Sequence, residues 1–202
     1  MFRRIFQAKN DRDYSPSDLL LRIEEEAAQI DEALRKETLG DVQQPLARLL
    51  AWLFSLCNRM NIDLQDVVWQ KYQGICPYCG REENCMCITY TDTQNPKEWY
   101  RNPSGKIPSS LKEWQVMFDK IYGRINSLMW LISIWLHFHE ELGEVIRDFR
   151  LKSPKMKEEI ADTFAWIIAF ANKIKINLEE ILWNQYPGRC DTCGKEKCIC
   201  PR

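Results

Sequence analysis

The sequence predicts an all-α protein in which two tandem repeats form a helical bundle, and three observations lead to that prediction. Apolar residues recur at helical spacing along most of the 202-residue chain. No stretch shows convincingly the alternation of apolar and polar residues that marks a β-strand. A segment of the first half matches a segment of the second half without gaps, which indicates that one structural unit occurs twice.

The repeat aligns residues 46–80 with residues 160–194 at a constant offset. Trp52 then matches Trp166, and Gly74 matches Gly188. Matching Trp, Gly and Cys residues at one offset are hard to produce by chance. We therefore predict a first repeat over residues 1–88 and a second over residues 110–202. Residues 89–109 are rich in Pro, Asn, Thr and Ser and are predicted to form the linker.

The first repeat begins with two helices whose starts can be predicted. Ser15 followed by Pro16, with Asp18 three residues after the serine, indicates an N-cap and the first turn of a helix. Asp41 with Gln44 resembles a capping box for the next helix. That second helix is apolar over so wide an arc that we expect it to be central in the bundle.

The second repeat follows the same plan. Ser110 with Glu113 predicts the cap of its opening helix, and Ser153, followed by proline, predicts the start of a later one. Short final helices are expected after Asp63 in the first repeat and after Asn177 in the second.

Eight of the nine cysteines fall into two compact clusters near the ends of the repeats. The first cluster contains Cys76, Cys79, Cys85 and Cys87, and the second contains Cys190, Cys193, Cys198 and Cys200. Four thiolates within a dozen residues suit one tetrahedral Zn²⁺. Two structural zinc knuckles are predicted, with a metal-free reduced tail and an iron–sulfur cluster as the alternatives. Cys57 lies in an apolar helical stripe and is expected to be a small core residue.

Composition excludes some classes of function. The net charge is −1, so there is no bulk electrostatic argument for binding nucleic acid or a membrane. The N-terminal residues lack the apolar region of a signal peptide, and the segment WLISIWLHF is too short to span a bilayer. A soluble cytoplasmic protein is expected.

Four acidic residues in the second repeat are spaced for a common site. Glu141 and Glu144 are three residues apart, as are Glu159 and Asp162, so each pair lies on one face of its helix. Two such helices packed antiparallel would bring four carboxylates together. Oxygen ligands alone favour a hard cation, Mg²⁺ or Mn²⁺. The alternative is a solvated helix face, which the apolar residues beside both pairs disfavour.

The text around these acids, EELGEV and then EIADTFAWIIAFANKIKINLEEIL, resembles the MazG-like nucleotide pyrophosphohydrolases of the all-α NTP pyrophosphatase superfamily. The resemblance covers about residues 111–186, and a weaker form covers about residues 15–72. It implies that Glu141, Glu144, Glu159 and Asp162 hold Mg²⁺. It also places Glu140 beside these ligands, where it could accept the proton of the attacking water.

The resemblance implies hydrolysis of a nucleoside triphosphate, NTP or dNTP, to the monophosphate and pyrophosphate. Two copies in one chain imply an internal pseudo-dimer, and further pairing as a homodimer is left open. Lys155 and Lys157 are candidates for phosphate contacts, with a solvated turn as the favoured alternative. The competing hypothesis for the whole protein is a non-catalytic zinc module, on a MazG-like scaffold, that binds nucleotides or proteins.

Aromatic residues near the acids could stack on a base. Trp166 and Tyr186 both recur in the first repeat, as Trp52 and Tyr72, which favours a role in core packing. His137, one helical turn before Glu141, is expected to pack or to be exposed rather than to bind metal.

The first repeat has lost most of the acidic set. Gln29, Pro45 and Arg48 stand where the second repeat has its last three acids, and Glu26 is left. This repeat is therefore predicted not to bind Mg²⁺. Arg48 would either neutralise Glu26 or reach a substrate phosphate across the interface between the repeats.

Overall fold

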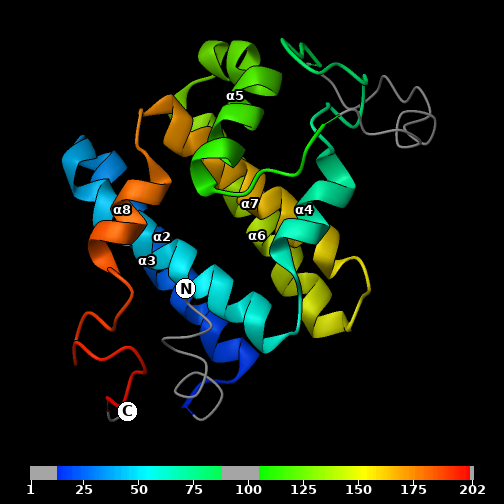
Figure 1. Cartoon of the computed structure of the whole chain (residues 1–202). Helices are drawn as coiled ribbons and strands as arrows, with labels where there is room; N and C mark the ends of the chain where they lie inside the picture. Colours follow the sequence, from blue (N-terminus) through cyan, green and yellow to red (C-terminus); the bar gives the residue numbers. More distant parts are fainter. Residues whose placement is uncertain (1–12, 88–104, 201–202) are drawn as a thin grey trace. The chain divides into compact units, whose positions relative to one another are not determined.

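The computed structural model describes residues 13–87 and 105–200, and all regular secondary structure in these residues is helical (Figure 1). The all-α fold class is thereby confirmed. The N-terminal residues 1–12 and most of the predicted linker lie outside the described residues. Within the described part of the chain, no helix combines the length and the apolar character needed to cross a membrane.

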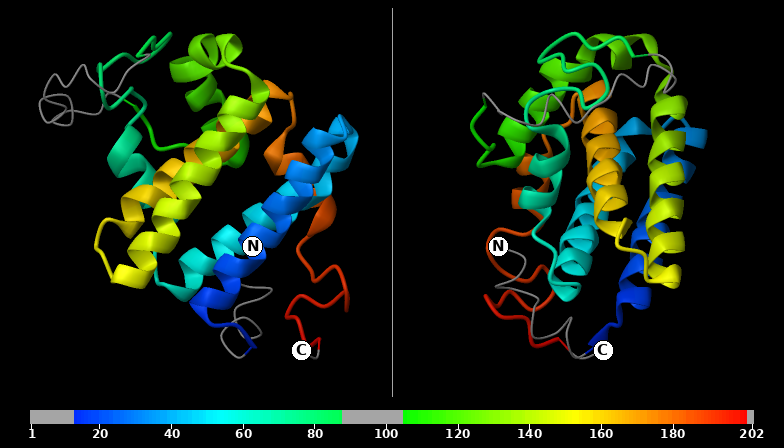
Figure 2. Two further views of the ribbon diagram at one scale, coloured as in Figure 1. Left: turned by 180° about the vertical axis from the view of Figure 1, so that it is seen from behind. Right: turned by 90° about the vertical axis from the view of Figure 1, so that its right-hand side faces the viewer.

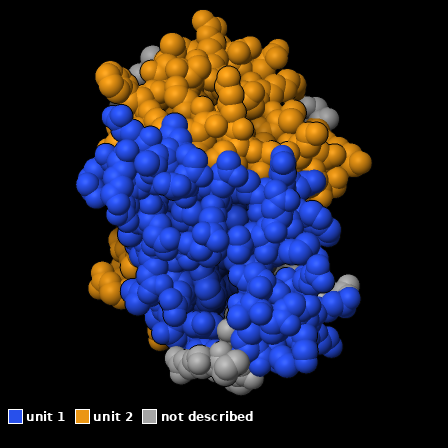
Figure 3. Space-filling view, turned by 90° about the vertical axis from the view of Figure 1, so that its left-hand side faces the viewer, with its two compact units in different colours: residues 1–63, 178–202 blue, residues 64–177 orange. Residues whose placement is uncertain are grey.

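The chain divides into two compact units (Figure 3). Unit 1 comprises Met1–Asp63 and Leu178–Arg202, and unit 2 comprises Leu64–Asn177. Unit 1 contains α2 (Pro16–Arg35), the 3₁₀ helix η1 (Leu39–Val42), α3 (Gln43–Arg59) and α8 (Leu178–Gln185). Unit 2 contains α4 (Leu64–Tyr72), α5 (Leu111–Leu128), α6 (Leu131–Leu151) and α7 (Met156–Lys173).

These units group the helices differently from the two predicted domains. Helix α4 is the last helix of the first repeat but belongs to unit 2, where it packs on α7. Helix α8 is the last helix of the second repeat but belongs to unit 1, where it packs on α3. Each repeat therefore contributes its long helices to one unit and its short final helix to the other.

Two of the predicted helix caps are confirmed. The Ser15 hydroxyl accepts a hydrogen bond from the Asp18 N–H at 3.2 Å, and the Asp18 carboxylate accepts one from the Ser15 N–H at 2.8 Å. This reciprocal pair satisfies two N–H groups that the first turn of α2 leaves without helical partners. Ser110 caps α5 by accepting a hydrogen bond from the Glu113 N–H at 3.1 Å.

Two other predicted helix starts are wrong. Asp41 does not cap α3, because η1 continues directly into that helix through Val42, whose backbone is already helical. Ser153 is not the N-cap of α7, which begins at Met156. The Ser153 hydroxyl accepts a hydrogen bond from the Lys155 N–H at 3.2 Å, so the serine closes a turn before the helix.

Each unit is centred on an antiparallel pair of long helices, α2 with α3 in unit 1 and α6 with α7 in unit 2 (Figure 2). Cys57 is 2% exposed in the core of unit 1, as predicted, and burial raises the pKa of its thiol to about 12. In unit 2 the Trp135 ring lies 4.3 Å from Phe138 and 4.6 Å from Phe170, centroid to centroid. These rings hold α6 against α7 and fix which faces of the two helices meet.

Candidate active site

Three of the four predicted acids meet in unit 2. Glu141 and Glu144 project from α6 and Glu159 from α7, and each offers a carboxylate oxygen within 4.8 Å of the others. All three side chains are half-buried. The prediction that the two helices bring their acids together is therefore confirmed for these three residues.

Asp162, the fourth acid, is held by side chains from α4. Its Oδ1 accepts a hydrogen bond from the Tyr72 hydroxyl at 2.6 Å, and its Oδ2 forms an ion pair with the Lys71 ammonium. Burial raises the pKa of Tyr72 well above its ordinary value, and the Asp162 charge raises it further, so the phenol is a hydrogen-bond donor at neutral pH. The first repeat thus contributes two partners to an acid of the second.

The ionisation of the acids reflects their burial and, after it, their mutual repulsion. Burial, followed by the charges of Asp162 and Glu159, raises the pKa of Glu141 to about 7. Burial and the charges of Glu144 and Asp162 also raise the pKa of Glu159. Lys71 opposes both shifts. Carboxylates that repel one another in this way are stabilised by a bound cation.

A further acid borders this group. Asp148 on α6 is 4% exposed, and its Oδ1 accepts a hydrogen bond from Arg147 Nε at 3.1 Å. Its buried Oδ2 has no hydrogen-bond partner among the described residues. Arg147 also donates to Glu144 at 2.9 Å. Sequence reasoning missed Asp148, although it follows Glu144 by four residues and therefore shares its helix face.

An apolar pocket of about 400 Å³ in unit 2 adjoins the acids, and Glu141 and Asp162 are part of its lining. The rest of the lining comes from α4, α5, α6, α7 and the first cysteine cluster. Aromatic residues contribute much of the wall: Tyr72, Tyr78, Phe118, Tyr122 and Trp166. A pocket that is apolar along one side and acidic at another suits a ligand with a planar apolar part and a part that binds a cation.

Trp166 and His137 occupy this pocket wall rather than the core. Their rings stack with centroids 4.4 Å apart and planes 15° from parallel, and both line the pocket. The favoured interpretation of Trp166 as a core residue therefore describes only part of its position, because part of the indole faces the cavity. Tyr186 is buried in unit 1, 6% exposed, as the core interpretation expects.

The remaining candidates lie outside the group of acids. The Glu140 side chain is 66% exposed, and its carboxylate is 3.1 Å from His137 Nδ1. Lys155 and Lys157 are exposed, and neither is among the described residues that line the pocket.

Both cysteine clusters are assembled and can hold a metal ion. In each cluster the four sulfurs lie within 4.8 Å of one another. Thiolates at the corners of a zinc tetrahedron are about 3.8 Å apart, since each Zn–S bond is about 2.3 Å. The Cys79–Cys85 sulfur distance is 3.7 Å, and the Cys190–Cys200 distance is 3.9 Å, so zinc fits the donor sets.

A glycine lies in the tight turn of each cysteine cluster. Gly80 and Gly194 have φ angles of 69° and 66°, in the left-handed region that glycine adopts without strain. In the second cluster a hydrogen bond from the Ile199 N–H, with further ones, lowers the pKa of Cys193 to about 6. That cysteine is therefore largely a thiolate at neutral pH, the form that binds metal.

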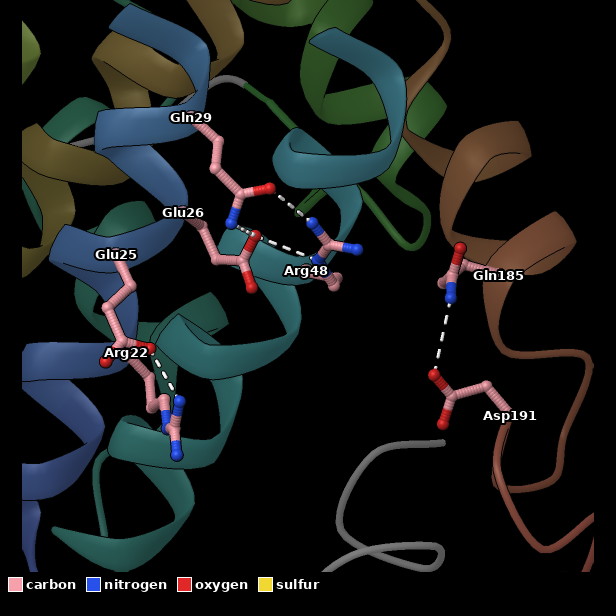
Figure 4. Close-up of polar contacts among 7 residues, drawn as sticks. All are labelled: Arg22, Glu25, Glu26, Gln29, Arg48, Gln185 and Asp191. Carbon is pink, nitrogen blue, oxygen red and sulfur yellow. Dashed lines mark hydrogen bonds and ion pairs between the residues drawn. The ribbon is translucent and has the colours of Figure 1, made fainter. Parts of the chain in front are cut away.

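Unit 1 contains the degenerate counterpart of the acidic site (Figure 4). Arg48 Nε donates to Glu26 at 2.8 Å and Arg48 Nη2 to Gln29 at 2.7 Å, while Gln29 donates to Glu26 at 3.2 Å. The predicted neutralisation of Glu26 by Arg48 is confirmed. Three side chains satisfy one another at the positions where unit 2 has a group of acids.

The equivalent of Lys71 in the second repeat is Gln185, and it bonds Asp191 at 3.4 Å (Figure 4). The exchange of Asp162 for Arg48 is thus accompanied by an exchange of Lys71 for Gln185. This paired charge change was visible in the aligned repeats and could have identified Lys71 as the partner of Asp162.

Comparisons with models of protein families, with curated proteins and with solved structures found no match. The side chains themselves are therefore what points to a function.

Proposed function

We propose that the protein is a magnesium-dependent nucleoside triphosphate pyrophosphohydrolase with its active site in unit 2. The observation that carries the proposal is the meeting of the Glu141, Glu144 and Glu159 carboxylates beside an apolar pocket with aromatic walls. A nucleotide has the matching chemistry, because its phosphates bind through a cation and its base is planar and apolar on both faces. The resemblance to MazG-like enzymes supports the same reaction.

The residues fit Mg²⁺, with Mn²⁺ as the alternative, because the donors are oxygens alone. Glu141, Glu144 and Glu159 would hold the ion directly. Asp162 would join them by exchanging its Lys71 partner for the metal while Tyr72 continues to position its other oxygen. The bound ion would offset charge on the phosphates and polarise the attacking water.

Lys71 gains a role in this proposal that the sequence did not suggest. Once released from Asp162, its ammonium group would lie beside the phosphates and stabilise charge on the leaving pyrophosphate. Proton transfer to Glu140 stays a prediction. The contact between Glu140 and His137 would then orient the accepting carboxylate beside the pocket.

The zinc proposal concerns the two cysteine clusters, each of which would hold one Zn²⁺ through four thiolates. The sites are closed, with no open position for substrate, so neither zinc would take part in the chemical step. Metal analysis of the purified protein should return about two zinc ions per chain. A protein free of zinc and iron would contradict this assignment.

The decisive experiment measures pyrophosphate release from a panel of NTPs and dNTPs in the presence of Mg²⁺. Glu141→Gln, Glu144→Gln and Asp162→Asn should each lower the rate by about a hundredfold, since each removes a charged ligand. Glu158→Gln is the matched control, because Glu158 is exposed on α7, the helix that carries Asp162. This variant should leave the rate unchanged. Absence of release with every nucleotide would refute the enzymatic proposal.

A non-catalytic module is the second candidate, and the unit 1 network of Arg48, Glu26 and Gln29 favours it. That network indicates that this helical pair forms without an acidic site. If the second candidate were correct, nucleotides would bind with no pyrophosphate release, and Glu141→Gln would leave their affinity unchanged.

A further inference from the structure

The first cysteine cluster lies at the pocket in unit 2, whereas a purely structural knuckle would need no such position. Cys76, Cys85 and Cys87 line the pocket, together with Tyr78 and Met86 from the same loop. These residues all come from the first repeat, while Glu141 at the acidic side comes from the second. One wall of the cavity is therefore a metal-binding loop.

We propose that zinc in the first cysteine cluster shapes a binding wall for the nucleobase, so that the degenerate repeat completes the substrate site of the intact one. The identity of the ligand rests on the proposed function. The second cysteine cluster has no such role. Of the two zinc ions, only the one in the first cluster affects the affinity for nucleotides.

The loop is docked firmly enough to serve as a wall. The Cys85 N–H donates to the Ile121 carbonyl of α5 at 2.7 Å, and the Asn84 N–H donates to the Lys120 carbonyl at 3.0 Å. Cys76 and Cys85 form a buried cluster with Ile121, against which Met117 and Tyr122 pack. The cysteine cluster is thereby joined to the packing of α5, and loss of its metal would loosen the pocket wall.

The surfaces facing this wall suit an aromatic ring system. Tyr72 and Phe118 meet edge to face at 4.9 Å, and Phe118 stacks with Tyr122 at 6.2 Å. Trp166 contributes an indole from α7. Aromatic walls of this kind stack with any base, while a few polar groups, such as the amide of Asn126 in the lining, select among base edges.

The second cysteine cluster provides the contrast. Cys190, Cys198 and Cys200 form a buried cluster whose packed neighbour is Cys193. Within the described chain, no apolar side chain from a helix belongs to that buried cluster, and none of its cysteines lines the pocket. The two knuckles have similar spacing and a similar donor set, so they form a matched pair for experiment.

The test compares Cys87→Ser with Cys200→Ser in the full chain. Each variant should lose about one of two zinc ions. Binding of an α,β-methylene nucleoside triphosphate, which cannot release pyrophosphate, should weaken about tenfold or more in Cys87→Ser and stay unchanged in Cys200→Ser. Inorganic tripolyphosphate with Mg²⁺ lacks a base and should bind both variants and the wild type alike.

Equal nucleotide affinities in the two variants would overturn the inference. A loss of tripolyphosphate binding in Cys87→Ser as large as its loss of nucleotide binding would overturn it too. If Cys87→Ser does not fold, Tyr78→Ala and Met86→Ala test the inference in its place, because they alter the wall without removing a zinc ligand. Both should keep two zinc ions and weaken nucleotide binding; wild-type affinity in both would overturn the inference. If the wild-type protein binds nucleotides without hydrolysing them, the proposed activity is refuted but the inference about the base-binding wall still holds.

Discussion

Glu141 connects the acidic group to the pocket, and its ionisation gives a testable pH dependence. Its pKa is raised to about 7 from an ordinary value of 4.5. In the metal-free protein, the stability that this shift contributes is present below about pH 4.5 and is lost as the pH rises through about 7. Above about pH 7 the carboxylate is charged and ready for a cation.

Mg²⁺ affinity should therefore increase as the pH rises from about 5.5 and level off above about 7, because metal binding displaces a proton from Glu141. Calorimetric titration at several pH values measures this. In Glu141→Gln the affinity should be weaker and its pH dependence flatter. An unchanged pH profile in that variant would show that another group controls the titration.

Lys71 gives the second prediction at this scale. It forms an ion pair with Asp162 and, under the proposed function, would compete with a cation for that carboxylate. Lys71→Gln should therefore bind Mg²⁺ about fivefold more tightly in the absence of nucleotide, as expected for the loss of a partly exposed ion pair. Lys120→Gln is the control, because Lys120 is an exposed cation of the same unit. Weaker Mg²⁺ binding in Lys71→Gln would contradict the competition.

At the scale of the helix, the two expected caps near the N-terminus make a comparison. Ser15→Ala removes a capping box and should lower the free energy of unfolding by about 1 kcal/mol. Asp41→Ala removes an exposed side chain that caps nothing and should change it by less than about 0.5 kcal/mol. Urea denaturation followed by circular dichroism measures both, and equal effects would contradict the assignment of the caps.

Local sequence signals predicted helices better than their starts. Ser15 and Ser110 act as caps because the backbone of each is extended directly before the first residue of its helix. The predicted starts of α3 and α7 were wrong because the turns before these helices already have helical or hydrogen-bonded backbone. The conformation of such a turn depends on how the chain leaves the previous helix. The pairing of acids on α6 and α7 was predictable, since spacing fixes a helix face.

What the sequence could not supply is the partner of a helix face. Lys71 reaches Asp162 from 91 residues away, and His137 meets Trp166 between two helices. The sequence likewise could not predict the exchange of α4 and α8 between the repeats. The apolar face of a short helix is compatible with packing in its own repeat or in the other, and tertiary packing decides between them.

At the scale of the whole molecule, this exchange predicts how fragments behave. Residues 1–88 alone contain α4 without α7, and residues 110–202 alone contain α8 without α3. Neither fragment should give a cooperative monomeric unfolding transition, whereas the two mixed should associate and regain one. Sedimentation and thermal unfolding test this, with the uncut chain as control. A monomeric, cooperatively folded fragment 110–202 would contradict the exchange.

The exchange also makes the two repeats depend on each other. The repeat without the acidic set carries α4 and the first cysteine cluster, both of which belong to the unit that holds the acids. Deleting that repeat would remove Lys71 and Tyr72 from Asp162, so neither repeat is a spare copy of the other.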